Sequence, residues 1–189
     1  SIYFDIQAAF DKVWHKGLIS KLIDLDIDIH WIKWIDAFLS NRATCVTVGE
    51  STSQYFNQTS GVLQGACLSP LLFSLFINDL PDKNSPNKSS TLLFVDDLVV
   101  SFIFRNKEIV EKHINSHLQQ IVDWLNKWRL KFAPSKCNYI IYQYGKPIDL
   151  DIRIYDTKIA KSDNPNFLGV KFDRTLSFKA HIEELKKKL

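Results

Sequence analysis

Two adjacent acids, Asp96 and Asp97, separate two apolar runs, Thr91–Val95 and Leu98–Phe104. Short runs of this kind predict strands, and the polar break between them predicts a tight β-hairpin with both acids at its tip. Neighbouring carboxylates repel each other, and desolvation disfavours their ionised forms unless a cation is bound. The fold must therefore leave this tip in water or supply it with cations.

A third acid, Asp5, lies near the carboxyl end of a predicted opening strand, Ile2–Ile6. If this strand is a neighbour of the hairpin, the three carboxylates can converge. Mg²⁺ is usually held by one or two carboxylates together with substrate phosphates, and a pair of such ions supports phosphoryl transfer. Acids are also common in solvated structural turns, so these residues alone leave both interpretations open.

Apolar residues at helical spacing predict the helices of the chain. Ser69 is expected to be the N-cap of one of them, with Pro70 at its first position, because these residue types favour those positions. The predicted helices cover Val13–Leu25, a segment that begins after Asp28, Ser69–Leu80 before Pro81, Lys107–Leu130 and Phe178–Leu189.

The remaining segments predict strands and loops. Thr44–Gly49 alternates in polarity and is expected to pair with Ser53–Thr59 as an exposed hairpin, while Asp82–Ser90 has the composition of a loop. Further short strands are expected around Tyr139–Tyr142, Ile152–Tyr155 and Phe167–Phe172. Together the elements predict an α+β fold, in which an antiparallel sheet carries the three acids on one side and helices pack on the other.

Composition is that of a globular domain, with 46% apolar and 24% charged residues. The formal net charge of +3 permits a polyanionic partner without requiring one. Neither a membrane span nor a signal peptide is expected, because no apolar run approaches the roughly 20 residues that a span needs. Cys45, Cys67 and Cys137 are far apart, so we expect reduced core residues rather than a zinc site or disulfides.

Nearly the whole chain resembles the non-LTR retrotransposon reverse transcriptases, especially the jockey-like group. Phe4–Ile6 with Ala9–His15 is similar to motif A of that family, and Gly61–Pro70, continuing to Ile77–Pro81, is similar to motif B. Phe94–Asp97 resembles motif C, the aromatic-x-Asp-Asp signature. This ordered set implies the palm fold of right-hand polymerases.

The resemblance implies a two-metal centre that uses Mg²⁺, with Mn²⁺ as an alternative. Asp5, Asp96 and Asp97 are the implied catalytic acids, and the same three residues with the Ile6 carbonyl are the implied metal ligands. Asp5 and Asp96 are expected to be the main ligands, with Asp97 in support.

The resemblance also implies contacts to substrate. Phe10 is expected to screen the sugar 2′ position, and the Gln64-Gly65 step is expected to contact the incoming nucleotide and the template. Lys136, in a segment similar to motif D, is expected near the nucleotide phosphates. Phe167–Val170 is similar to the primer-grip hairpin of motif E, with Leu168 and Gly169 at its centre.

The implied reaction is RNA-directed DNA synthesis. Its partners would be an RNA template, a DNA primer, deoxynucleoside triphosphates and other regions of the same polyprotein, with no membrane. Residues 1–175 would be the palm, with part of the fingers missing upstream, and residues 176–189 the start of the thumb. The implied location is intracellular, in the cytoplasm and nucleus. A non-catalytic remnant or a repurposed nucleic-acid-binding domain is the alternative.

Several side chains outside these motifs are expected to be structural. Asp11 is expected to cap a helix or to pair with Lys12 or Lys16. His15, His113 and His117 are expected to be solvated helix histidines rather than a metal site, because no third ligand is apparent beside His113 and His117. Trp34, Trp124 and Trp128 are expected to pack in the core, whereas Lys186–Lys188 fits a solvated face and a duplex contact equally well.

Overall fold

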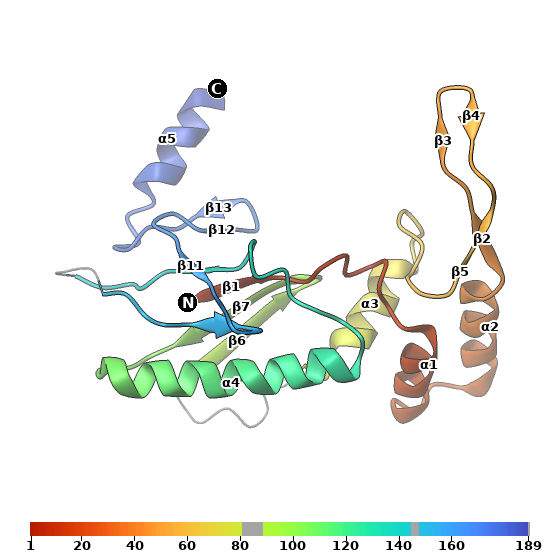
Figure 1. Cartoon of the computed structure of the whole chain (residues 1–189), viewed down its shortest axis with the longest axis horizontal. Helices are drawn as coiled ribbons and strands as arrows, with labels where there is room; N and C mark the ends of the chain where they lie inside the picture. The colour runs from red at the N-terminus through yellow and green to blue at the C-terminus, as the bar shows by residue number, and fades with distance from the viewer. Residues whose placement is uncertain (81–88, 145–147, 189) are drawn as a thin grey trace. The chain divides into compact units, whose positions relative to one another are not determined.

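A computed structural model describes residues 1–80, 89–144 and 148–188 of the chain (Figure 1). The chain divides into two compact units, each assembled from separate segments. The first unit consists of Ser1–Gln7, Leu80–Lys127 and Lys131–Leu189, and the second consists of Ala8–Asp79 and Trp128–Leu130.

The first unit is built on a five-stranded sheet with the order β11-β8-β1-β7-β6. The strands β6, β7, β1 and β8 are antiparallel neighbours, as predicted, whereas β11 joins β8 in parallel. The strands are β1 (Ile2–Asp5), β6 (Ser89–Phe94), β7 (Asp97–Phe102), β8 (Asn138–Tyr139) and β11 (Ala160–Lys161). Most of the loop expected at Asp82–Ser90 lies outside the described residues, but Ser89 and Ser90 are strand residues.

The long helix α4 (Lys107–Lys127) covers one face of this sheet (Figure 1). Its buried positions recur every three or four residues, as expected for an amphipathic helix. His117 is among them, with its ring 5.6 Å from that of Phe102 in β7, so the prediction that His117 is solvated was wrong. The helix ends at Lys127 instead of Leu130, because Arg129 has a φ of +61°.

The opposite face of the sheet carries the hairpin formed by β12 (Asn166–Phe167) and β13 (Val170–Lys171). Phe167 packs its ring 6.0 Å from that of Tyr3 in β1. Residues Leu168 and Gly169 both have positive φ, which is the backbone of a tight two-residue turn. The predicted hairpin is therefore confirmed. A smaller sheet pairs β9 (Arg153–Ile154) with β10 (Thr157–Lys158).

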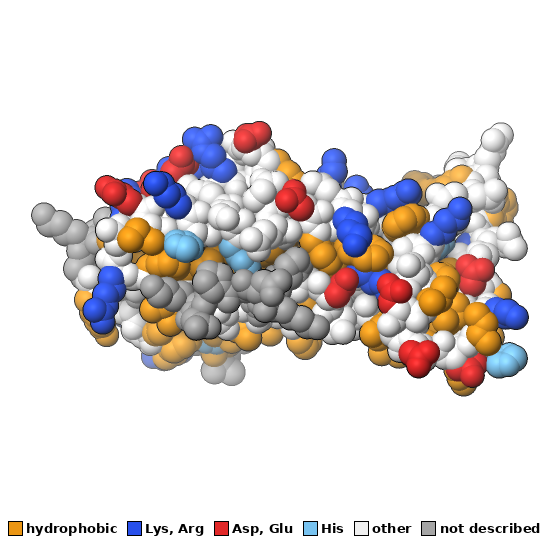
Figure 2. Space-filling model, turned by 90° about the horizontal axis from the view of Figure 1, so that it is seen from below, with side chains coloured by type: hydrophobic (Ala, Val, Ile, Leu, Met, Phe, Trp, Pro, Cys, Tyr) orange, Lys and Arg blue, Asp and Glu red, His pale blue; other side chains and the backbone are white. Residues whose placement is uncertain are grey.

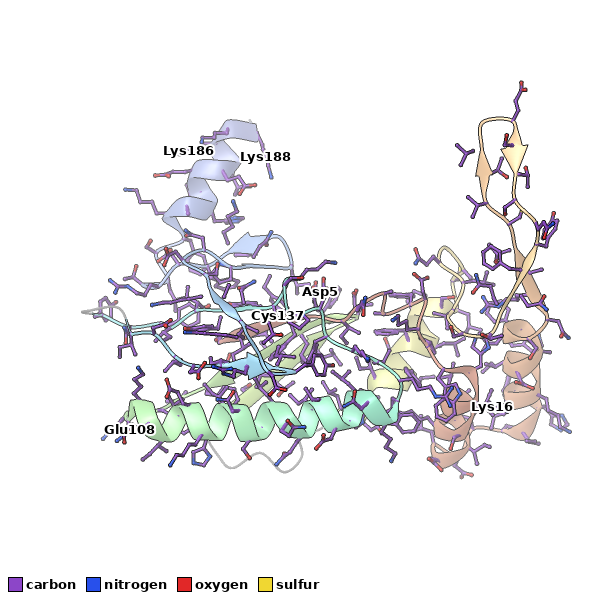
Figure 3. The ribbon with its side chains drawn as sticks, viewed as in Figure 1. Asp5, Lys16, Glu108, Cys137, Lys186 and Lys188 are labelled. Carbon is purple, nitrogen blue, oxygen red and sulfur yellow. The ribbon has the colours of Figure 1, made fainter. Side chains whose placement is uncertain are left out.

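The helix α5 (Lys179–Lys188) follows this hairpin and has no buried residue among those described. Asp173 accepts hydrogen bonds from the backbone N–H groups of Ser177 and Phe178 just before the helix, and Lys171 of β13 pairs with Glu184 at 2.6 Å. Figure 3 labels Lys186 and Lys188 on this helix. The role of the lysine run stays a prediction.

The second unit contains three helices and a β-hairpin. The helices α1 (His15–Asp24), α2 (Ile29–Leu39) and α3 (Ser69–Ile77) supply its core, and Lys21 is buried among them. The exposed hairpin extends from Arg42 to Gln58 and turns at Gly49-Glu50. Its outer pair is β2 with β5 and its inner pair is β3 with β4. The strands are β2 (Arg42–Thr44), β3 (Thr47–Val48), β4 (Ser51–Thr52) and β5 (Phe56–Gln58).

The predictions made for Ser69, Trp34 and Cys67 in the second unit were wrong. The N-cap of α3 is Leu68, so Ser69 is the first helical residue and its side chain caps nothing. Trp34 is exposed, although Trp124 in the first unit and Trp128 in the second are buried as expected. Cys67 is also exposed.

Of the other two cysteines, Cys137 is buried and Cys45 is partly buried, and all three are free thiols. The face shown in Figure 2 carries basic and acidic side chains interspersed, in keeping with the small net charge. Within the described residues, no helix has both the length and the apolar character that a membrane crossing requires.

Candidate active site

Two of the predicted acids face each other across neighbouring strands of the first unit. The pairing of β1 with β7 sets Asp5 directly opposite Asp97, and Asp97 in turn lies opposite Phe94 in β6. Residues paired in this way project from the same face of a sheet, with Cβ atoms roughly 5 Å apart. Asp96 precedes Asp97 in the turn, next to Val95 with its φ of +54°. The hairpin tip is therefore Val95-Asp96, and Asp97 is a strand residue.

The three carboxylates interact electrostatically. Although Asp97 is an exposed residue, partial burial of its carboxyl group raises its pKa, and the charges of Asp96 and Asp5 raise the pKa further. Such a group is easier to ionise when a cation is near. The three acids were predicted to converge where the opening strand meets the hairpin. The backbone pairing of Asp5 with Asp97 and the effect of Asp5 and Asp96 on the Asp97 pKa confirm this.

Lys136 supplies one cation at this site. Its Nζ lies 3.5 Å from Oδ1 of Asp5, and the lysine side chain is 67% exposed and the aspartate side chain 42% exposed, so solvent weakens the pair. The backbone explains the approach, because Ala133 donates to the Asp5 carbonyl at 2.9 Å and Lys136 donates to the Ala133 carbonyl at 2.9 Å. A segment more than a hundred residues from Asp5 in sequence is thereby fixed beside it.

Cys137 follows this lysine and lies next to Asp5 (Figure 3). Burial raises the pKa of its thiol to about 11, so the group stays neutral near pH 7. Ile6 is also buried, and it forms an isolated bridge with Phe132. These contacts fix the backbone on both sides of the acid.

The donor types at the strand end fit a hard divalent cation, because carboxylate oxygens are the ligands that Mg²⁺ prefers. Desolvation and the neighbouring charges of Asp96 and Asp5 raise the Asp97 pKa, and a bound cation would favour the ionised carboxylate against both. Over residues 1–80, 89–144 and 148–188, however, no three His, Cys, Asp or Glu side chains are gathered closely enough, as they stand, to hold an ion. The acids therefore fit a metal by their chemistry and by the backbone pairing of Asp5 with Asp97.

The hairpin β12–β13 lies on the same face of the sheet as the acids. Tyr3, which contacts Phe167, is two residues from Asp5 in one strand, and residues at this spacing share a face. Leu168 at the turn is half exposed, and a side chain added at Gly169 would meet nothing within 4 Å. The expected primer-grip residues Leu168 and Gly169 are therefore accessible at the surface of the unit.

The second unit holds three of the residues expected to bind nucleotide, namely Phe10, Gln64 and Gly65. The ring of Phe10 stacks on that of Phe73 in α3, with centroids 4.9 Å apart and planes 17° apart. Gln64 and Gly65 are both exposed, and Gly65 has a φ of +89°, which favours glycine. Phe10 is partly buried and held by its aromatic neighbour.

Asp11 has a different partner from those expected. Its Oδ1 accepts a hydrogen bond of 2.9 Å from Nε2 of Gln64, whereas pairing with Lys12 or Lys16 was predicted. The two residues are 53 positions apart, so no local pattern could reveal this contact.

Sequence reasoning also missed two side chains that hold the start of the segment similar to motif B. His15 Nε2 lies 2.8 Å from the Gly61 carbonyl oxygen, and Arg42 Nη2 donates to the same oxygen at 2.5 Å. Burial lowers the pKa of Arg42. His15 is the last residue of the segment similar to motif A, and it is partly buried and bonded where it was expected to be solvated. Nothing in the sequence connects Arg42 to Gly61.

Comparisons with known proteins agree with the resemblance carried by the sequence motifs. A family model described as "Reverse transcriptase (RNA-dependent DNA polymerase)" matches residues 1–172. The chain is 28% identical over 191 residues to the probable RNA-directed DNA polymerase from transposon X-element of Drosophila melanogaster, with all of the chain covered. It is 29% identical over 192 residues to the RNA-directed DNA polymerase from mobile element jockey of Drosophila funebris, with 98% covered. The chain spans 21% of the length of each relative.

Solved structures confirm the α+β fold. The structure of apo telomerase from Candida Tropicalis truncated from its C-terminal domain has a TM-score of 0.64 and 16% identity, covering 93% of this chain and 34% of that one. A second, of telomerase from Candida Tropicalis with a TWJ fragment of telomeric RNA, has a TM-score of 0.60 and 15% identity, covering 99% of this chain and 33% of that one.

Proposed function

The chain belongs to the reverse transcriptase family, whose members use divalent metal ions, and we propose that its parent protein is an RNA-directed DNA polymerase of a non-LTR retrotransposon. In this reaction a primer 3′-hydroxyl attacks the α-phosphate of a deoxynucleotide and pyrophosphate leaves. The observation that carries the proposal is the pairing of Asp5 with Asp97 across β1 and β7, with Asp96 in the adjoining turn.

The metal centre is proposed on the acids of the first unit. Asp5 and Asp96 would be the main ligands of two Mg²⁺ ions, or of Mn²⁺, with Asp97 and the Ile6 carbonyl in support. Such ions would neutralise phosphate charge and activate the primer hydroxyl. Lys136, held beside Asp5, would add a positive charge for the triphosphate.

The remaining contacts are proposed on the exposed residues already described. Leu168 and Gly169 would hold the primer, where the lack of a side chain at Gly169 permits close approach of a backbone. Phe10, supported by Phe73, would exclude a sugar 2′-hydroxyl, and Gln64 with Gly65 would contact the incoming nucleotide.

The partners proposed from family membership are an RNA template, a DNA primer, deoxynucleoside triphosphates and other regions of the same polyprotein. The proposed domain limits are 1–175 for the palm and 176–189 for the start of the thumb, with an intracellular location in the cytoplasm and nucleus. The isolated chain is not expected to extend a primer, because it spans only 21% of its relatives.

Primer extension by the complete open reading frame on an RNA template tests the proposal. We expect Asp96→Asn to lower Mg²⁺-dependent synthesis by at least roughly 100-fold, since loss of groups that merely support metal ligands already costs 10- to 100-fold. Asp36→Asn, which changes an exposed acid on α2, is the matched control and should retain wild-type activity.

Appreciable synthesis by Asp96→Asn would remove Asp96 from the proposed role. If the wild type makes no product with or without Mg²⁺ but still binds a primer–template duplex, the non-catalytic nucleic-acid-binding alternative replaces the polymerase.

A further inference from the structure

The hydrogen bond between Gln64 and Asp11 gives the glutamine amide a defined orientation. Gln64 Nε2 donates to Asp11 Oδ1 at 2.9 Å. An ionised carboxylate only accepts hydrogen bonds, so the nitrogen of the amide must face Asp11. The amide oxygen of Gln64 is then left to accept a hydrogen bond from another group.

The backbones around the two residues are fastened to each other. Gly61 donates to the Val13 carbonyl at 2.8 Å, and Val62 donates to the Phe10 carbonyl at 2.8 Å. The Ser60 hydroxyl donates to the Asp11 carbonyl at 3.1 Å. The segment that carries Gln64 is therefore held against the segment that carries Asp11 by bonds on both sides of the acid.

The close approach depends on the glycine. A Cβ at Gly61 would lie 2.8 Å from the Asp11 carbonyl oxygen and 2.9 Å from its Cα, and both are backbone atoms that cannot turn aside. Gly61 also has a φ of +88°, which other residues rarely adopt. The contact between Asp11 and Gln64 is thus part of a built backbone junction, although both side chains are exposed.

We propose that Asp11 is a positioning residue for the incoming deoxynucleotide, which turns the Gln64 amide oxygen toward a hydrogen-bond donor of that nucleotide. This rests on the proposed function, in which Gln64 contacts the nucleotide. Ionised phosphate oxygens only accept hydrogen bonds, so an amide oxygen in this orientation recognises the sugar or the base. Asp11 itself touches no substrate and acts through Gln64.

Steady-state kinetics of the complete open reading frame test this role, with KM for deoxynucleotides and kcat measured separately on an RNA template. Asp11→Leu removes the acceptor at similar size, and we expect it to raise KM roughly 5- to 30-fold with a smaller change in kcat. This is less than the loss of a buried hydrogen bond to a charged group would cause, because both side chains are exposed. Asp11→Asn keeps an acceptor oxygen and should stay within roughly threefold of wild type. Asp36→Leu is the control for removing an exposed acid.

A double-mutant cycle separates positioning from a merely structural role. If Asp11 acts through Gln64, then Asp11→Leu adds nothing to KM in a Gln64→Leu background. Melting temperatures of all variants are recorded. If Asp11→Leu lowers the melting temperature appreciably, Asp11→Ala takes its place in the cycle.

Independent effects that multiply in the double variant would overturn the inference, as would an Asn variant as impaired as the Leu variant. In either case the wild type would still synthesise DNA, so the result would contradict this inference and not the proposed function. A wild type that neither extends a primer nor binds a nonhydrolysable deoxynucleotide analogue on primer–template would overturn the inference and the proposed function together.

Discussion

Tyr139 joins the central sheet to the segment that follows it. Its ring is buried in β8, its hydroxyl donates to Asp149 Oδ1 at 2.6 Å, and the same hydroxyl accepts from the Leu150 N–H at 3.0 Å. Burial, followed by the bond to Asp149, raises the pKa of Tyr139 to about 12. The neutral phenol is therefore the form that the folded chain stabilises.

Tyr139→Phe should lower the stability of the chain by about 1–3 kcal/mol at pH 7, because the Leu150 N–H loses its acceptor. In the unfolded chain a tyrosine ionises near pH 10, so the contribution of Tyr139 is fully present below pH 10 and is lost as the pH rises toward 12. Denaturant unfolding between pH 7 and pH 12 measures the difference between wild type and variant.

The same substitution at Tyr144, which is 88% exposed, is the control and should change little. A difference between wild type and Tyr139→Phe that stays constant up to pH 12 would contradict the assigned cause.

Residue burial was only partly predictable from the sequence. On α2 the buried stripe is Ile32, Ile35 and Leu39, and Trp34 stacks on Phe38 outside it. Both the buried stripe and the Trp34–Phe38 pair have helical spacing. Periodicity therefore identifies apolar faces of the helix but does not say which of them packs against the rest of the protein. His117 was misjudged for a related reason, because its cover is Phe102, a residue of a distant strand.

At the scale of elements, Lys21 connects α1 to α3. Its ammonium group donates to the Phe76 carbonyl and to Asp79, and it lies 3.9 Å from the centroid of the Trp128 ring. The lysine is almost fully buried, whereas the Asp79 side chain is about half exposed. Carbonyl, carboxylate and ring together compensate for the desolvation of the charge.

Lys21→Met should therefore destabilise the second unit by about 1–3 kcal/mol, less than for a fully buried pair because water can still reach Asp79. Thermal or denaturant unfolding of the chain measures the loss. Lys33→Met, at an exposed position of α2, is the matched control and is expected to stay close to wild type. A Lys21→Met variant as stable as this control would show that the buried charge contributes nothing to stability.

Elements that have a recognisable local sequence pattern were predicted well. Elements that form only by pairing with a strand far away in the sequence were not. The hairpin at Phe167–Val170 was predicted from its similarity to motif E, and β1 from its apolar run. The strand β11 has two residues, too few for any alternation, and exists because it pairs with β8. The prediction of Ser69 as an N-cap was wrong by one residue, because α3 already begins at Ser69.

At the scale of the whole molecule, the acids of the proposed metal centre all belong to the first unit. The pairing of Asp5 with Asp97 was predicted as convergence, but the register that produces it could not be read from the sequence. The division into units was not predictable either, because Trp128–Leu130 continues the helical pattern of α4 and yet belongs to the second unit.

Binding of Mg²⁺ should therefore act on one unit. We expect Mg²⁺ to slow hydrogen exchange of backbone amides in β1, β6 and β7 of the full-length protein and to leave α1 and α2 unchanged, because ligand binding stabilises only what it contacts or couples to. Exchange followed by mass spectrometry, with Asp5→Asn as the variant that should lose the effect, measures this. Equal protection of both units, or protection that survives Asp5→Asn, would contradict the proposed centre.

The nesting of the second unit within the first has a consequence for the newly made chain. The edge of β1 that pairs with β7 must wait for a strand more than ninety residues later, whereas most of the second unit is complete once Asp79 has emerged. At a ribosome rate of roughly 5–20 residues per second, that edge stays without its partner for about 5–20 seconds. The helices α1, α2 and α3 are thus free to acquire structure before β1 completes its sheet.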